Sequence, residues 1–325
     1  MKEIGGYIEL DRQGGSLYHD GAVTLNCGRA ALEYVIRAKR VKEIWLPYFC
    51  CDSVAQPCRK LGLVIQYYHV GYNFLPVVPE KLSSGSWLYI VNYYGQLSNE
   101  QLREFKSKYV NLIVDNAQAY FQMPIDGAHT LYTCRKFFGV SDGAFLYTDT
   151  KLGNLPQDYS YERIHYILGR FEKSAGEFYA ESARNNEIFA DEPVKQMSKL
   201  TDNFLRTINY GMVKKQRTEN FKYLHECFLS YNRLHLVVPE GAFMYPLYIE
   251  NGTVIRKALQ AEKIYVPTLW PDVLKHCESG SVEYDMAENI LPLPVDQRYS
   301  REDMKYIERE VVKLIPLSGN LIENK

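Results

Sequence analysis

The chain has 325 residues, and 46% of them are hydrophobic, so it can bury enough core for one large domain and a smaller one. Its 38 Lys and Arg residues nearly balance its 39 Asp and Glu residues, which leaves a net charge of -1. A chain with this balance has no excess positive field for holding a polyanion. The composition therefore indicates a globular protein and argues against a nucleic-acid partner.

The cysteines and the N-terminus indicate the compartment. Residues 1–6 lack the basic segment, apolar run and cleavage site of a secretory signal, and no stretch is apolar enough to span a bilayer. The seven cysteines are an odd number without Cys-x-x-Cys spacing, and the seven histidines are scattered. We expect reduced thiols, no metal site, no membrane partner and a cytoplasmic location.

Helical and β-rich runs alternate from about residue 24 to 150, which is typical of parallel α/β structure. The strand runs are apolar on both faces, as expected where helices cover both sides of a sheet. Functional groups should then gather at the carboxyl ends of the strands. The expected helices span 29–39, 53–61 and 99–108, and the expected strands span 44–49, 64–70, 87–93, 112–115, 130–134 and 144–147.

The second half of the chain changes character. Strand signals disappear between residues 159 and 232, where helices are expected from 161–170 through 213–229. Strands return at 244–249 and 264–266, with helices near 254–261 and 301–314. We therefore predict three parts: a large α/β domain (1–158), a helical connecting region (159–235) and a small C-terminal α/β domain (236–325).

Asp115 ends a buried strand run, where an unpaired carboxylate is costly. A protonated pyridine nitrogen is one possible partner, because the carboxylate would keep the ring cationic and able to accept electrons. The alternative is that Asp115 simply caps the following turn.

Lys136 and Gly28 follow two other strand-like runs. For Lys136 alone, a surface position is the simpler interpretation, but Thr133 three residues earlier could bind a phosphate oxygen while the lysine amine reaches an aldehyde of the same ligand. Gly28 and Arg29 open the predicted helix at 29–39, and a helix N-terminus is a natural phosphate seat. An ordinary glycine turn before a helix is the alternative there.

Taken together, these motifs resemble the DegT/DnrJ/EryC1/StrS family of sugar aminotransferases, which use pyridoxal 5′-phosphate (PLP). The resemblance covers roughly residues 20 to 315. It rests on the run from Asn26 to Ala31, on Leu46-Pro47 before a helix, on the run from Val91 to Gln96, on Asp115-Asn116-Ala117-Gln118, and on the spacing of Lys136 to Asp142-Gly143-Ala144.

The resemblance implies the PLP-dependent transferase fold type I, with a large domain built on a mostly parallel sheet and a small C-terminal α/β domain. It implies a Schiff base on Lys136, a contact of Asp115 with the pyridine nitrogen and a contact of Gln118 with the cofactor. Gly28, Arg29 and Thr133 would hold the phosphate. A homodimer is implied as well.

The sequence also departs from the family. The position that often carries an aromatic ring over the cofactor, four residues after Pro47, is Cys51; Phe49 or Tyr48 could substitute for that ring. The family's Asn-x-Arg motif is not clear between residues 201 and 210. Tyr94, at a strand end beside Gly95, is a further candidate for the cofactor or sugar pocket.

We therefore expect transamination from an amino donor, with glutamate as the first choice, to a nucleotide-linked keto-sugar. Three alternatives stay open. The chain could bind PLP without transaminase activity, as Cys51 would allow. It could be a PLP-dependent sugar dehydratase, although such relatives carry histidine at the position of Lys136. It could also be a nucleotide-binding module, such as a glycosyltransferase, in which Asp115 binds a metal.

Overall fold

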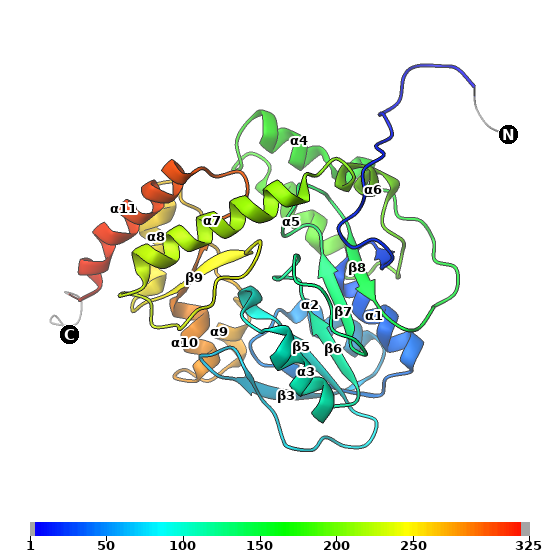
Figure 1. Ribbon diagram of the computed structural model, residues 1–325, viewed down its shortest axis with the longest axis horizontal. Helices are drawn as coiled ribbons and strands as arrows, with labels where there is room; N and C mark the ends of the chain where they lie inside the picture. Colours follow the sequence, from blue (N-terminus) through cyan, green and yellow to red (C-terminus); the bar gives the residue numbers. More distant parts are fainter. Residues whose placement is uncertain (1–3, 320–325) are drawn as a thin grey trace.

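The structure is a computed structural model that describes residues 4–319, with the side chains of residues 316–319 left out. Its larger unit is built on an eight-stranded mixed sheet in the order β1-β8-β7-β6-β5-β2-β3-β4 (Figure 1). β2, β3, β5, β6 and β7 are parallel, β8 is antiparallel to both β7 and β1, and β4 is antiparallel to β3. The strands are β1 (Val23–Leu25), β2 (Glu43–Pro47), β3 (Val64–Val70), β4 (Pro76–Val77), β5 (Trp87–Val91), β6 (Leu112–Asp115), β7 (His129–Thr133) and β8 (Ala144–Tyr147).

Helices connect and cover this sheet. α3 begins with a capping box, in which the Ser98 hydroxyl accepts from the Gln101 amide and the Gln101 side chain accepts from the Ser98 amide. α4 buries none of its residues, whereas α1 buries seven. The helices of this part are α1 (Gly28–Lys39), α2 (Asp52–Lys60), η1 (Tyr93–Gly95), α3 (Asn99–Lys108), η2 (Tyr161–Arg163), α4 (His165–Glu172), α5 (Tyr179–Ile188) and α6 (Lys199–Leu205).

A smaller α/β unit forms the C-terminal part, with a core of its own. Its strands β9 and β10 pair antiparallel, and α7 and α11 contribute buried residues to the same core. The expected fold type, with a large sheet unit and a small C-terminal unit, is confirmed. The elements are α7 (Tyr210–Phe228), β9 (Met244–Tyr248), α8 (Gly252–Ala261), α9 (Val273–His276), α10 (Val282–Asn289), β10 (Ile290–Pro294) and α11 (Arg301–Gly319).

Two sequence predictions differ from the structure in this C-terminal part. Residues 264–266 do not form a strand, although Ile264 and Val266 are buried in the small core, so their apolar pattern reflects packing and not a ladder. β10 was not predicted because Pro292 and Pro294 argue against a strand. Both prolines are accommodated in a sheet that consists of β9 and β10 only. The domain boundaries stay a prediction. Residues of α7, which precede the predicted boundary at residue 236, are buried in the core of the small unit.

The strand order reverses between β2 and β5. From β2 the chain passes through α2 to β3 on one side, and from β5 it passes through α3 to β6 on the other. Because crossovers between parallel strands are right-handed, the two connecting helices cover opposite faces of the sheet. Ligands of open α/β sheets bind outside the carboxyl ends of the strands at such a reversal. This edge, beyond Pro47, Val91 and Asp115, is where a site is expected.

No helix within residues 4–319 is long and apolar enough to cross a membrane.

Candidate cofactor site

Three of the motifs singled out in the sequence meet at this edge of the sheet. β1 is antiparallel to β8, which is antiparallel to β7, so β1 and β7 point the same way. Asn26, Asp115 and Thr133 therefore all lie at the carboxyl ends of their strands. The Gly143 amide donates to the Asn26 carbonyl oxygen at 2.6 Å, which joins the end of β1 to the segment that follows Lys136.

Gly28 and Thr133 form one side of the site. Gly28 opens α1, whose first N–H groups lack partners within the helix and carry a partial positive charge. The Thr133 side chain lies directly against Gly28, and its buried hydroxyl has no hydrogen-bond partner among residues 4–319. A helix N-terminus and a free hydroxyl beside a residue without a side chain suit a phosphate group. Gly28 and Thr133 are therefore compatible with the phosphate of PLP, and their role in holding it stays a prediction.

Asn26 is a candidate that the sequence analysis did not assign. It is fully buried, and neither Oδ1 nor Nδ2 finds a hydrogen-bond partner in the described part of the chain. Buried amides are costly when unpaired, so such a side chain points to a polar ligand. The signal in the sequence was its place directly before the Cys27-Gly28 turn.

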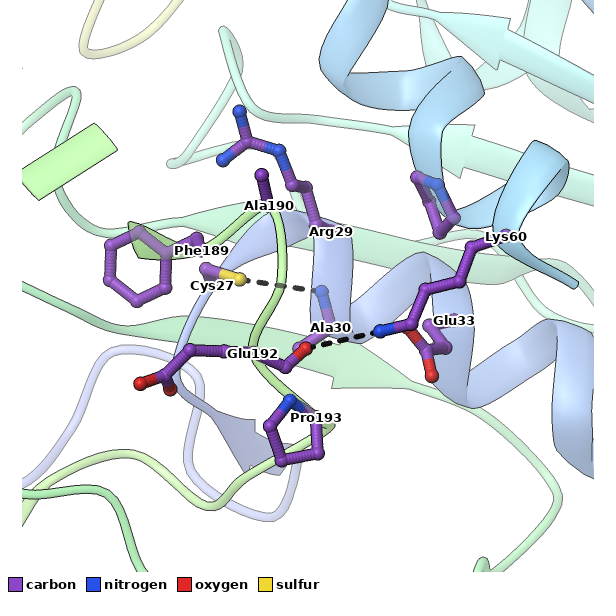
Figure 2. A pocket seen from close by; sticks show the side chains of 10 residues that line it. Cys27, Arg29, Ala30, Glu33, Lys60, Phe189, Ala190, Glu192 and Pro193 are labelled. Carbon is purple, nitrogen blue, oxygen red and sulfur yellow. Dashed lines mark hydrogen bonds and ion pairs between the residues drawn. The ribbon is translucent and has the colours of Figure 1, made fainter. Parts of the chain in front are cut away.

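Two arginines lie near the start of α1. Burial raises the pKa of the Cys27 thiol, and the charges of Arg29 and Arg135 oppose that rise, so both guanidinium groups lie near this N-cap. Arg29 is occupied, because Nε donates to Gln56 at 3.0 Å and Nη1 donates to the Asn186 carbonyl oxygen at 3.2 Å. Arg29 also lines the small pocket of Figure 2. Its phosphate role stays a prediction.

Arg135 was not singled out by the sequence. Its guanidinium lies 5.0 Å from the centre of the Phe189 ring and donates to the side chain of Asn186. Its Nε has no partner among the residues that the structure describes. Burial lowers the pKa of Arg135 from its usual range, yet an arginine stays charged at neutral pH. Arg135 could therefore supply the positive charge that was expected from Arg29.

Asp115 is buried, and both of its carboxylate oxygens are hydrogen-bonded. Oδ1 accepts from the Ala117 amide at 2.8 Å, which is the turn cap considered as an alternative. Oδ2 accepts from the Tyr89 hydroxyl at 2.7 Å. A carboxylate offers about four lone-pair positions, so these two bonds leave room for a further donor. The capping role and a contact with a pyridine nitrogen are therefore compatible.

Cys50 is a thiol whose pKa responds to the charges of both Asp115 and Lys136. Burial raises the pKa of the Cys50 thiol well above its usual range; the charge of Asp115 raises it further, and the charge of Lys136 opposes the rise. Both charged groups are therefore near the same thiol. Lys136 is exposed, and its Nζ lies 5.6 Å from the centre of the Phe243 ring, just before β9 of the small unit. Cys51, the N-cap of α2, is exposed next to Cys50.

The segment that carries Lys136 is anchored at both ends. On one side the Phe137 carbonyl oxygen accepts from Arg217 at 3.1 Å and from Gln297 at 2.8 Å. On the other side the buried Asp142 accepts from the Ser198 amide and hydroxyl, both at 2.7 Å. These bonds fix the backbone that follows Lys136.

The predicted aromatic candidates are mostly covered. Phe49 is 1% exposed and packs 4.5 Å from Trp270 and 5.3 Å from Tyr93 between ring centres. Tyr94 is also 1% exposed and adopts φ 54°, which is uncommon for a residue with a side chain. Its amide donates to the Gln118 side-chain oxygen at 2.8 Å. Phe49 and Tyr94 are thus covered by other side chains, and their contact with a cofactor stays a prediction.

A cavity of about 470 Å³ lies beside Gln118. It is bounded by the end of η1, the start of α3, the segment after β6 and residues 237–242, and neither Lys136 nor Asp115 lines it. Within residues 4–319, no three His, Cys, Asp or Glu side chains are grouped so that they could hold a metal ion.

No model of a known protein family matches the sequence, and no curated protein matches it. Solved structures do match the fold. A DegT/DnrJ/EryC1/StrS aminotransferase from Brucella abortus has a TM-score of 0.63 at 12% identity over 90% of this chain and 86% of its own. DesV of S. venezuelae has a TM-score of 0.63 at 14% identity over 90% and 84%.

A proposed sugar aminotransferase from Streptococcus pneumoniae has been solved in apo, PLP and pyridoxamine 5′-phosphate (PMP) forms. Its PMP form has a TM-score of 0.64 at 14% identity over 93% of this chain and 88% of its own. Identities this low establish the architecture and not the activity. The chain has the fold of the DegT/DnrJ/EryC1/StrS aminotransferases.

Proposed function

We propose that this protein is a PLP-dependent aminotransferase with Lys136 as the residue that binds the cofactor. One observation carries the proposal: the buried, hydrogen-bonded Asp115 ends β6 beside the end of β7, where the Thr133 hydroxyl, without a partner among residues 4–319, lies against the start of α1 and Lys136 follows. Bound PLP would supply an electron sink for the carbon that loses or gains the amine.

The chain's own residues have separate tasks in this proposal. Thr133, Asn26 and the first turn of α1 bind the phosphate. Asp115 accepts a hydrogen bond from the ring nitrogen and so keeps its positive charge in place. The Lys136 amine binds the aldehyde and, once displaced by the amine of a substrate, moves a proton between two carbons as a general base and acid.

The substrate and the assembly are also part of the proposal. The structural neighbour from Streptococcus pneumoniae, named above as a proposed sugar aminotransferase, supports a sugar as amino acceptor, and we propose a nucleotide-linked keto-sugar with glutamate as donor. Tyr48 follows the carboxyl end of β2 and stacks 5.1 Å from Tyr67 of β3; each is 40% exposed and could face a sugar ring. We further propose a homodimer in the cytoplasm.

The test is the visible absorbance of the protein with PLP, before and after glutamate is added. We expect a Schiff-base band that glutamate removes and that Lys136→Ala lacks. Lys151→Ala, a change at an exposed lysine, is the matched control and should keep the band.

A second function is favoured by one observation, the exposed thiol of Cys51 where an aromatic ring is expected. A PLP-binding protein without transaminase activity would show the band, and neither glutamate nor other amino donors would remove it. The absence of any band in the natural chain would contradict both functions.

A further inference from the structure

Tyr89 lies on β5, directly beside the strand that ends in Asp115. β5 pairs parallel with β6, and Val91 is the register partner of Asp115. Tyr89, two residues earlier, is 2% exposed and reaches the end of the neighbouring strand, where its hydroxyl donates to Oδ2 of Asp115 at 2.7 Å. The backbone of Tyr89 is held in turn, because its carbonyl oxygen accepts from the Tyr68 hydroxyl at 2.7 Å.

The Tyr89 hydroxyl acts as a hydrogen-bond donor to the Asp115 carboxylate. Burial raises the pKa of Tyr89 well above its usual range, and the negative charge of Asp115 raises it further. The other polar side chains around Asp115 are neutral as well, because burial likewise raises the pKa of Cys50, Tyr68 and Tyr93. Lys136 is a cation near this group, and its charge opposes the rise in the pKa of Cys50.

We propose that Tyr89 is a positioning residue that fixes the orientation of the Asp115 carboxylate, so that it can accept a hydrogen bond from a protonated ring nitrogen. The inference rests on the proposed function. A hydrogen bond to the ionised form favours that form, and this matters most where burial opposes charge. The Tyr89 bond also restricts the rotation of the carboxylate, since Oδ1 is held by the Ala117 amide.

The Tyr89 bond should affect the protonation of the pyridine nitrogen of bound PLP. With PLP bound, Asp115 would accept a hydrogen bond from the ring nitrogen, and the donor from Tyr89 would favour the arrangement with charged carboxylate and charged ring. Without that donor, the neutral arrangement gains weight. The ring then accepts electrons less readily, and its attachment to the site weakens.

The experiment compares Tyr89→Phe with the natural protein by ¹⁵N NMR of PLP labelled at the pyridine nitrogen, together with the PLP Kd. In the natural protein we expect the chemical shift of a protonated ring. In Tyr89→Phe we expect a shift toward the neutral ring and a PLP Kd about tenfold higher, the loss typical of one hydrogen bond to a charged group.

The matched control is Tyr109→Phe, which removes a hydroxyl that donates to the Pro79 carbonyl oxygen at 2.7 Å, before the start of β6 and not at Asp115. It should lower stability and leave the ¹⁵N shift unchanged. A protonated ring in Tyr89→Phe, or an equal shift in Tyr109→Phe, overturns the inference while the proposed function stands. Failure of the natural protein to bind labelled PLP overturns both.

Discussion

Arg217 of α7 donates to the carbonyl oxygen of Phe137, the residue that immediately follows Lys136. The same guanidinium donates to the carbonyl oxygens of Ala242 and Phe243 at 2.9 and 3.3 Å and to Gln297 at 2.7 Å. Arg217 is 1% exposed, and its burial lowers its pKa to about 10, so it stays charged at neutral pH. One buried side chain thus connects the Lys136 segment with the small unit.

Replacing Arg217 by Met should leave several buried carbonyl groups without donors. We expect the free energy of unfolding to fall by about 3 kcal/mol or more, since each unpaired buried acceptor costs about 1–3 kcal/mol. Urea unfolding measures this. Arg233→Met removes an exposed ion pair with Glu250 and should cost under about 1 kcal/mol. Equal losses in the two variants would contradict the role of Arg217.

The sequence predicted most strands of the large sheet and the motifs at their ends because buried apolar runs and turn residues are local signals; it did not predict the two-residue β4 (Pro76–Val77). It did not predict the bond between Tyr89 and Asp115, since that bond depends on which strands are neighbours. Arg135 and Asn26 were missed for a similar reason. Their importance lies in unpaired buried atoms, which only the packed structure reveals.

Gly28 should not tolerate a side chain. A β-carbon there would lie 2.8 Å from Cγ2 of Thr133, so the Thr133 side chain or the backbone has to move and the Thr133 hydroxyl is displaced. Gly28→Ala should therefore raise the PLP Kd about tenfold, the size of an overpacking cost of about 1–3 kcal/mol. Titration of the visible band gives the Kd. Gly176→Ala, where a β-carbon meets no atom within 4 Å, is the control. An unchanged Kd in Gly28→Ala would remove Gly28 from the phosphate site.

His19 should make the fold sensitive to acid. It is fully buried, its Nε2 donates to the Tyr120 carbonyl oxygen at 2.8 Å, and burial lowers its pKa from 6.5 to about 4. The unfolded chain therefore binds a proton in a pH range in which folded His19 stays neutral. Stability should fall by about 3 kcal/mol as the pH drops from about 6.5 to about 4.

The pH dependence of urea unfolding checks this, because His19→Gln should flatten that part of the curve. His165→Gln is the control, since His165 is exposed and paired with Glu181. If both variants keep the full slope, His19 does not cause it.

Cys51 offers a gain-of-affinity test. An aromatic ring at this exposed position beside Cys50 could cover the face of the cofactor ring, and aromatic pairs contribute about 0.5–1.5 kcal/mol. Cys51→Tyr should therefore lower the PLP Kd by about two- to tenfold, whereas Cys51→Ser should leave it nearly unchanged. Weaker binding in Cys51→Tyr would show that this position does not face the ring.

In the proposed function, Lys136 forms the covalent bond to PLP. The most direct measurement is reduction of the PLP-loaded protein with borohydride, followed by proteolysis and mass spectrometry of the peptides. We expect a phosphopyridoxyl group on Lys136 in nearly all of the modified protein. Modification spread over surface lysines, or concentrated on a lysine other than Lys136, would contradict it.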